Sequence, residues 1–252
     1  MSALVTTSVK DGILTIRMNR PDKKNALTHA MYDAMGKALG EADADPAVRV
    51  VLITGTADCF CAGNDLKDFL ENPPGAKNSP VLNFLKALSG AKLPVVAAVN
   101  GPAVGIGVTM LLHCDFVYIS KTANLSLPFV DLGLVPEAAA SMLLPHLAGH
   151  PRAAELLMLG EPFTPQQAVE MGIANATCEP QDVEAAALKT ALKLAAKPRN
   201  ALLQTKALMR ADFESVSKRI DREAEIFKEC LASPDAQEAF TAFREKRKPK
   251  FS

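Results

Sequence analysis

The 252-residue sequence contains no tryptophan and only two tyrosines. Because single-stranded nucleic acids and sugars are usually held on aromatic side chains, such stacking platforms are scarce here. The formal net charge is zero, with 28 basic and 28 acidic side chains, so the overall basic field typical of nucleic-acid-binding proteins is also absent. We therefore expect no nucleic-acid partner.

Metal ligands and disulfide partners are few. The chain has four histidines and five cysteines, and neither an HExxH motif nor a paired Cys/His spacing occurs. We therefore predict no metal site. An odd number of cysteines without a CxxC pair is typical of reduced thiols in an intracellular protein.

Long apolar runs and targeting signals are missing too. No hydrophobic stretch is long enough to span a bilayer, and the opening MSALVTTSVKDG resembles neither a signal peptide nor an Arg-rich transit peptide. The final RKPKFS is not an SKL-type peroxisomal address. Hydrophobic residues make up 48% and charged residues 22%, as in ordinary globular proteins. We expect a cytoplasmic protein with no membrane partner.

Strand and helix patterns alternate through most of the chain. Two β-rich runs around Lys10-Asp11-Gly12 predict a hairpin, and Thr28 is placed to cap a helix ending near Asp45-Pro46. Short aliphatic runs predict buried strands at 48–55, 93–101 and 115–120, with helices at 81–91 and 106–114 between them. This alternation predicts an α/β core with parallel strands. The Pro- and Gly-rich segment 72–80 is typical of a mobile surface loop.

The pattern changes near Pro198. From there the chain shows amphipathic helices and no strand pattern, including 215–232. We therefore predict an α/β domain over residues 1–197 and a helical region over residues 198–252. Exposed apolar faces on those helices could pack against a partner subunit.

Two glycine-rich stretches suggest a ligand-binding site. In CFCAGNDLKDF (59–69) the small residues would leave the backbone N–H of Ala62 free to approach a ligand. In NGPAVGIGVTMLLHCD (100–115) the amide of Ile106 would lie at the positive end of a helix. Two such amides from separate loops can form an oxyanion hole. The glycines could instead serve close packing; a nucleotide loop fits poorly because neither GxGxxG nor GK[ST] is present.

Glu137 interrupts the apolar stretch SLPFVDLGLVPEAAAS (126–141). It follows Pro136, and an acidic residue after proline is typical of the first turn of a helix. Alternatively, a carboxylate among apolar residues could transfer protons. Both interpretations stay open on local sequence alone.

Four motifs in order, NRPDKKNALT, CAGNDLKDF, LPVVAAVNGPAVGIGVTMLLHCDFVYIS and AFREKRKPKF, together resemble the crotonase (enoyl-CoA hydratase/isomerase) superfamily. The resemblance covers nearly the whole chain. It implies an α/β fold, the crotonase (ClpP-like) spiral of ββα units, with a C-terminal helical trimerisation region. It also implies that the amides of Ala62 and Ile106 hold an acyl-thioester oxygen.

The departures from the family pattern favour one branch. Hydratases of the family carry two glutamates, and the matching positions here are Thr109 and Phe129, which cannot transfer a proton. The chain instead resembles the Δ3,Δ2-enoyl-CoA isomerases, whose single glutamate corresponds to Glu137. In that branch glycine often follows the acid. We expect Ala138 to be accepted there because only helical φ and ψ would be needed.

The resemblance implies a complete site and partners. A single glutamate would move a proton between two carbons of a 3-enoyl-CoA, as in fatty acid β-oxidation, in a pocket with Phe129, Thr109 and Leu134. Coenzyme A would be part of the substrate, with no separate cofactor, and the enzyme would be a homotrimer or a hexamer. The residues expected near coenzyme A are Lys24, Ala26, Ala62, Gly63, Asn64, Asp65, Leu66, Phe243 and Lys246. Asp65 is as readily interpreted as a helix cap.

Two other functions remain open. One is a hydratase or another acyl-CoA lyase that uses Asp68, Asp131 or a further acid. The other is a non-catalytic, CoA- or partner-binding module, as in the chromodomain-Y-type proteins. Retention of an acid at position 137 favours an enzyme.

Overall fold

The fold is taken from a computed structural model that describes residues 3–56, 58–71, 79–210, 229, 233–245 and 247–250. The chain forms two compact units, Met1–Ala191 and Leu192–Ser252. The division lies within one long helix, before the 197/198 boundary expected from the sequence.

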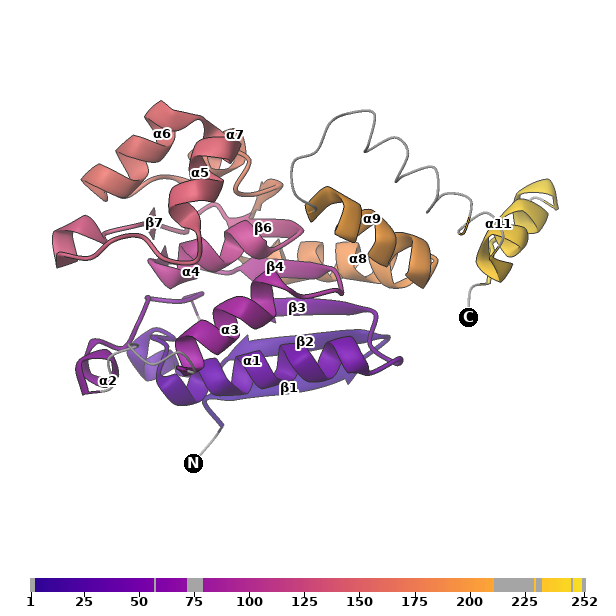
Figure 1. Cartoon of the computed structure of the whole chain (residues 1–252), viewed down its shortest axis with the longest axis horizontal. Helices are drawn as coiled ribbons and strands as arrows, with labels where there is room; N and C mark the ends of the chain where they lie inside the picture. Colours follow the sequence, from indigo (N-terminus) through magenta and orange to yellow (C-terminus); the bar gives the residue numbers. More distant parts are fainter. Residues whose placement is uncertain are drawn as a thin grey trace. The chain divides into compact units, whose positions relative to one another are not determined.

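A six-stranded sheet forms the centre of the first unit, in the order β1-β2-β3-β4-β6-β8 (Figure 1). Only β1 and β2 pair antiparallel; every other neighbouring pair is parallel. The short strands β5 and β7 form a separate parallel pair. The strands are β1 (Val5–Lys10), β2 (Ile13–Met18), β3 (Val50–Thr54), β4 (Val95–Val99), β5 (Ala103–Val104), β6 (Phe116–Ser120), β7 (Leu125–Ser126) and β8 (Ala176–Cys178).

Helices cover the sheet and build the upper part of the unit in Figure 1. The α-helices are α1 (His29–Ala44), α2 (Leu66–Glu71), α3 (Pro80–Ser89), α4 (Ile106–Thr109), α5 (Ala140–Ala148), α6 (His150–Ala154), α7 (Pro165–Glu170), α8 (Val183–Ala195), α9 (Arg199–Arg210) and α11 (Pro234–Arg244). Short 3-10 segments are η1 (Pro21–Lys23), η2 (Met110–His113), η3 (Val130–Leu132) and η5 (Pro180–Asp182), and η4 (Glu155–Leu159) is one turn of π-helix.

Local chemistry explains the predicted elements. Asp11 and Gly12 both have positive φ, 51° and 73°, as the tight turn of a right-twisted hairpin requires. The Thr28 hydroxyl accepts a hydrogen bond from the Met31 amide and caps α1. Every residue of β3 and β4 is buried, which fits strands covered on both faces.

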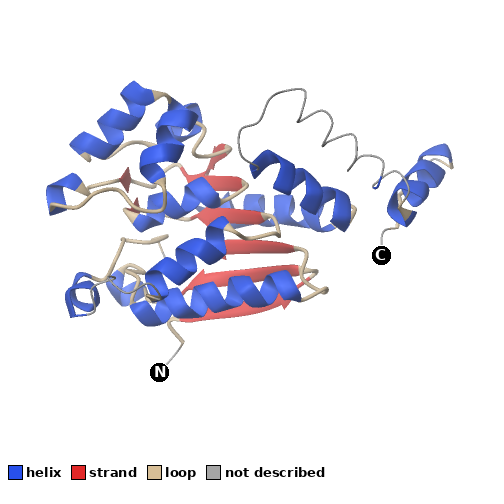
Figure 2. Cartoon of the chain, in the orientation of Figure 1, coloured by secondary structure: helices blue, strands red, loops and turns tan. Residues whose placement is uncertain are grey.

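Helices lie on both faces of this sheet. Figure 2 shows α1 and α3 in front of it, and the rings of Tyr32 and Phe84 from these two helices lie 5.5 Å apart. The first part of α8 is tied to the strands by two contacts. Arg17 of β2 binds Glu184, and the Tyr118 hydroxyl of β6 contacts that of Thr190 at 2.6 Å. The α/β core with parallel strands is therefore confirmed.

Some expectations need refinement. The predicted helix 106–114 is a single α-helical turn, α4, continued by the 3-10 segment η2. The strands β5, β7 and β8 were missed because each has only two or three residues. Most of segment 72–80 and of the predicted helix 215–232 lies outside the described residues.

The second unit contains α9 and α11, which are amphipathic helices as expected. Its role in subunit assembly stays a prediction. No helix in the described part of the chain is long and apolar enough to cross a membrane.

Candidate active site

The two glycine-rich loops lie side by side. Cys61 forms an isolated parallel bridge with Ala103, and the Val104 amide donates to the Cys61 carbonyl at 2.9 Å. A Cβ atom built on Gly107 would stand only 2.5 Å from that same carbonyl oxygen. Glycine at position 107 therefore allows the start of α4 to approach the 59–65 loop more closely than any other residue would.

The Ala62 amide is not free, which corrects the sequence expectation. It donates to the Lys24 carbonyl at 3.0 Å. The 59–65 loop runs between two other segments, 24–27 on one side and 102–104 on the other, and Ala62 faces the first. The loop sequence gives no sign of this pairing because its partner lies nearly forty positions earlier in the chain.

The Asn64 amide faces the other way. Leu27 donates to the Gly63 carbonyl and accepts from the Asp65 amide, both at 2.8 Å. In this parallel bridge the N–H of the intervening residue, Asn64, points away from Leu27. The Asn64 N–H therefore points to the other side of the 59–65 loop, where residues 102–106 lie.

Ile106 supplies a second open amide. It is the first residue of α4, so its N–H has no partner within the helix. Across the described residues, no acceptor is found for the Asn64 amide or for the Ile106 amide. The two adjacent loops therefore offer one donor each, Asn64 and Ile106, for a ligand oxygen.

Glu137 reaches this region from a third segment. It lies between η3 and α5, before the helix begins at Ala140, so the interpretation of Glu137 as a first-turn helix residue is wrong. Its Oε1 atom accepts a hydrogen bond of 2.9 Å from the hydroxyl of Thr109, a fully buried residue of α4. The carboxylate is thus held against the same one-turn helix that begins with Ile106.

Burial raises the pKa of Glu137 above its usual 4.5, and the Thr109 hydrogen bond opposes that rise only partly. The Glu137 charge also reaches the 59–65 loop. Burial raises the pKa of the Tyr32 hydroxyl, and burial raises the pKa of the Cys61 thiol to about 12; the Glu137 charge adds to both shifts. The Glu137 carboxyl group is therefore easier to protonate than the carboxyl group of an exposed glutamate.

The backbone after Glu137 is strained. Ala138 and Ala139 have φ angles of 52° and 56°, in the left-handed region. This conformation costs a non-glycine residue roughly 1–2 kcal/mol. The expectation that Ala138 needs only helical angles is therefore wrong, and the turn explains why glycine suits this position.

The expected apolar surroundings are only partly present. Phe129 is buried, as is Thr109, but Leu134 and Val135 are 45% and 82% exposed. The two residues are therefore not the buried apolar side chains that the sequence suggested. Tyr32 was missed; its hydroxyl donates to Asn64 Oδ1 at 2.5 Å and so fixes the side chain next to the open amide.

The residues expected near coenzyme A lie along two neighbouring segments. Lys24 is exposed and Ala26 is half-buried, and both border the 62–66 loop through the pairing of Lys24 with Ala62. Leu66 is exposed at the start of α2. The side chain of Phe243 and the whole of Lys246 lie outside the described residues.

Asp65 holds the loop in place. Its carboxylate accepts from the Asp68 amide at 3.0 Å, at the start of α2, and from Arg20 at 2.7 Å. These bonds, the amide bond first, lower the pKa of Asp65. Asn25, whose role was also missed, is fully buried and donates to the Cys59 carbonyl at 2.7 Å. Two lysines precede it in the sequence, so the local sequence does not indicate that Asn25 is buried.

The two alternative acids lie in other surroundings than Glu137. Asp68 accepts from the backbone amide and the Nδ1 atom of His29, at 2.7 and 2.6 Å. Asp131 is exposed on η3. Among the described residues, no three His, Cys, Asp or Glu side chains gather as a metal site would require.

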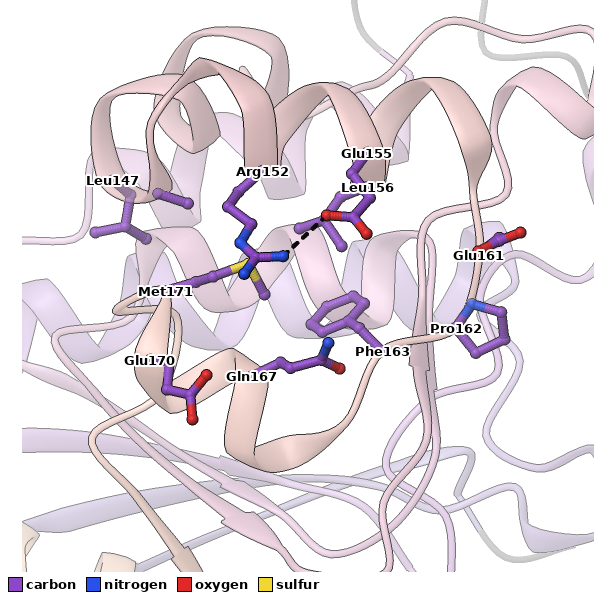
Figure 3. Close-up of a pocket in the computed structure, with 11 residues that line it drawn as sticks. Leu147, Arg152, Glu155, Leu156, Glu161, Pro162, Phe163, Gln167, Glu170 and Met171 are labelled. Carbon is purple, nitrogen blue, oxygen red and sulfur yellow. Dashed lines mark hydrogen bonds and ion pairs between the residues drawn. The ribbon is translucent and has the colours of Figure 1, made fainter.

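A separate pocket of about 350 Å³ lies among α5, α6, η4 and α7 (Figure 3). Phe163 and Met171 line it, and Arg152 and Glu155 pair at 3.1 Å on its wall. No residue predicted for the active site lines it.

Comparisons with known proteins identify the family of the chain. The family model described as enoyl-CoA hydratase/isomerase matches residues 8–252. The 1,2-epoxyphenylacetyl-CoA isomerase of Escherichia coli K12 is 30% identical, over 100% of this chain and 99% of that protein. Human enoyl-CoA delta isomerase 2 is 39% identical over 82% of this chain, which spans about half of that protein (54%).

A solved structure is also closely similar. The putative enoyl-CoA hydratase/carnithine racemase of Magnetospirillum magneticum AMB-1 superposes with a TM-score of 0.97, at 49% identity and with 100% of both chains covered. The predicted resemblance is thereby confirmed. This chain belongs to the enoyl-CoA hydratase/isomerase family.

Proposed function

We propose that the protein is a Δ3,Δ2-enoyl-CoA isomerase that uses Glu137 as its only proton-transfer group. One observation carries this proposal: a half-buried carboxyl with a raised pKa is hydrogen-bonded to Thr109 of the one-turn helix whose first amide, that of Ile106, is open. Its hydrogen-bond partner, Thr109, stands where hydratases of the family carry a glutamate. The similarity to human enoyl-CoA delta isomerase 2 supports the same assignment.

The reaction needs one base that becomes an acid. Glu137 removes a proton from C2 of the 3-enoyl thioester, and the electron pair moves into a dienolate whose charge lies largely on the thioester oxygen. The Glu137 carboxylic acid then returns the proton to C4, leaving the double bond between C2 and C3. A raised pKa makes the carboxylate a stronger base for the first step, and a pKa nearer the operating pH lets the same group act as base and then as acid.

The thioester oxygen would be held by the amides of Asn64 and Ile106. Asn64 replaces Ala62 in this role because the Ala62 amide is already bonded to Lys24. In comparable sites, loss of one such donor costs about 2.7–4 kcal/mol in the transition state. Lys24, Ala26 and residues 63–66 would border the coenzyme A portion, and a homotrimer or hexamer remains the expected assembly.

Three carboxylate variants, each with a neutral amide of similar shape, test the assignment: Glu137→Gln, Asp68→Asn and Asp131→Asn. With 3-enoyl-CoA substrates of graded chain length, Glu137→Gln should lower kcat by about 10²–10⁴-fold, the range for loss of a proton-transfer group. The two aspartate variants serve as controls and should retain wild-type turnover.

The same proteins should be incubated with 2-enoyl-CoA while 3-hydroxyacyl-CoA is measured. Rapid hydration by the wild-type protein, lost in Asp68→Asn or Asp131→Asn, would replace the isomerase with the hydratase alternative. Normal isomerisation by Glu137→Gln would show that the base is elsewhere.

A further inference from the structure

The turn that presents Glu137 is held from one side by a continuous helical segment. That segment comprises α4 and η2 and runs from Ile106 to His113. Thr109 binds the carboxylate itself, and His113 binds the backbone of the next residue: its Nε2 lies 2.8 Å from the Ala138 carbonyl oxygen. Helix α4–η2 therefore contacts both the side chain of Glu137 and the peptide that follows it.

The Ala138 carbonyl needs such a partner. Helix α5 begins two residues later, and the amides of Met142 and Leu143 both donate to the Ala139 carbonyl instead. The helix thus leaves the Ala138 oxygen without an amide. Because a carbonyl only accepts, His113 must carry its hydrogen on Nε2, as it does in one neutral tautomer and in the protonated ring.

The hydrogen bond acts on a backbone that would otherwise relax. Both Ala138 and Ala139 are held at positive φ, a conformation that alanine adopts only when its surroundings impose it. The Thr109 hydroxyl and the Ala140 amide hold Glu137, and the Met142 and Leu143 amides hold Ala139, whereas the His113 bond is made to Ala138 itself. If Ala138 relaxed to a negative φ, the direction of the preceding residue, Glu137, would change relative to α5, and the carboxylate would move.

We propose that His113 is a positioning residue for Glu137: its Nε2–H fixes the left-handed turn at Ala138 and so aims the carboxylate at the acyl chain. The proposal rests on the proposed role of Glu137 in proton transfer. It assigns a role to His113, whose place on an apolar helical segment otherwise predicts only a core histidine.

The test compares His113→Leu, which removes the donor, with His113→Gln, whose amide N–H can reach a similar point. With a 3-enoyl-CoA substrate, His113→Leu should lower kcat about tenfold and leave KM within twofold, because binding groups are untouched. His113→Gln should restore most of kcat. The control is His146→Leu, which removes another bond between a histidine ring and a backbone carbonyl, 2.7 Å from Met142 in α5, and should keep wild-type kcat.

A second readout does not depend on the reaction. The Glu137 side-chain carboxyl is titrated by ¹³C NMR, with its signal assigned by its loss in Glu137→Gln. The raised pKa should persist in His113→Gln and fall toward the ordinary glutamate value in His113→Leu, because a released turn lets water reach the carboxylate. If the wild-type protein fails to isomerise 3-enoyl-CoA, the proposed function fails, and the titration alone decides the role of His113.

Wild-type kcat together with an unchanged Glu137 titration in His113→Leu would overturn the proposal. An equal fall of kcat in His113→Leu and His113→Gln, with melting temperatures lowered to the same extent, would also overturn it, because it would show a purely structural histidine.

Discussion

Substitution of Gly107 by alanine tests the contact on which the two-amide site depends. The added Cβ would stand 2.5 Å from the Cys61 carbonyl oxygen and 3.1 Å from the Cys61 Cβ, whereas ordinary contacts begin at 3.4 Å. One of the two loops must therefore retreat by about 0.9 Å. Both neighbours at Cys61 are backbone or Cβ atoms, so no flexible side chain can absorb the shift.

Two effects should follow in Gly107→Ala. Overpacking of this kind typically costs about 1–3 kcal/mol of stability. Because the displaced loops carry the Asn64 and Ile106 amides, the misplacement should also lower kcat by about 10²-fold, as expected for an error of ~1 Å in a catalytic geometry. Because residues 63–66 of the displaced loop are also proposed to border coenzyme A, KM should rise as well.

The assay combines steady-state isomerisation of a 3-enoyl-CoA with thermal unfolding. Gly40→Ala is the matched control. Gly40 lies within α1, a Cβ there meets no atom within 4 Å, and alanine in a helix interior should stabilise the protein by about 0.5–1 kcal/mol. Native kcat in a folded Gly107→Ala protein would refute the assignment of the oxyanion site to these two loops.

Two further predictions concern the groups around Glu137. Ala138→Gly should raise the unfolding free energy by up to about 1.6 kcal/mol, because the relief of a left-handed alanine (roughly 1–2 kcal/mol) is at least as large as the added entropy of unfolded glycine (about 0.4–1 kcal/mol). Calorimetry measures this change, and a lower melting temperature would contradict the strained turn. Thr109→Val removes a hydrogen bond that lowers the Glu137 pKa, so that pKa should rise further and the acidic limb of the kcat/KM profile should move to higher pH. A limb that stays in place or moves to lower pH would show that Thr109 does not act on the carboxylate that reacts.

Local sequence patterns were sufficient for the core elements. The hairpin is dictated by Asp11-Gly12, whose positive φ angles few residue pairs accept, and the start of α1 by the Thr28 hydroxyl. The continuous aliphatic runs of β3 and β4 predicted strands buried on both faces. Each of these signals involves residues that are neighbours in the chain, and for that reason they can be read without coordinates.

The position of Glu137 was predicted by its chemical contrast with the apolar residues around it. The residues that surround Glu137 in the folded chain were not predicted. Leu134 and Val135 lie three and two residues before it and are exposed, whereas Tyr32 and Cys61, whose pKa values respond to its charge, come from distant parts of the chain. Burial depends on which segments pack together, and residue type alone gives only a tendency.

The order of residues is enough to predict a parallel α/β core, two glycine-rich loops and a glutamate in an apolar stretch. Which loop amide is open depends on how the chain folds. Ala62 and Asn64 are two residues apart on the same small-residue loop, yet the first is bonded to Lys24 and the second faces the start of α4. That choice is made by the pairing of segments far apart in the chain, because each backbone N–H can be satisfied only by the acceptor that folding brings beside it.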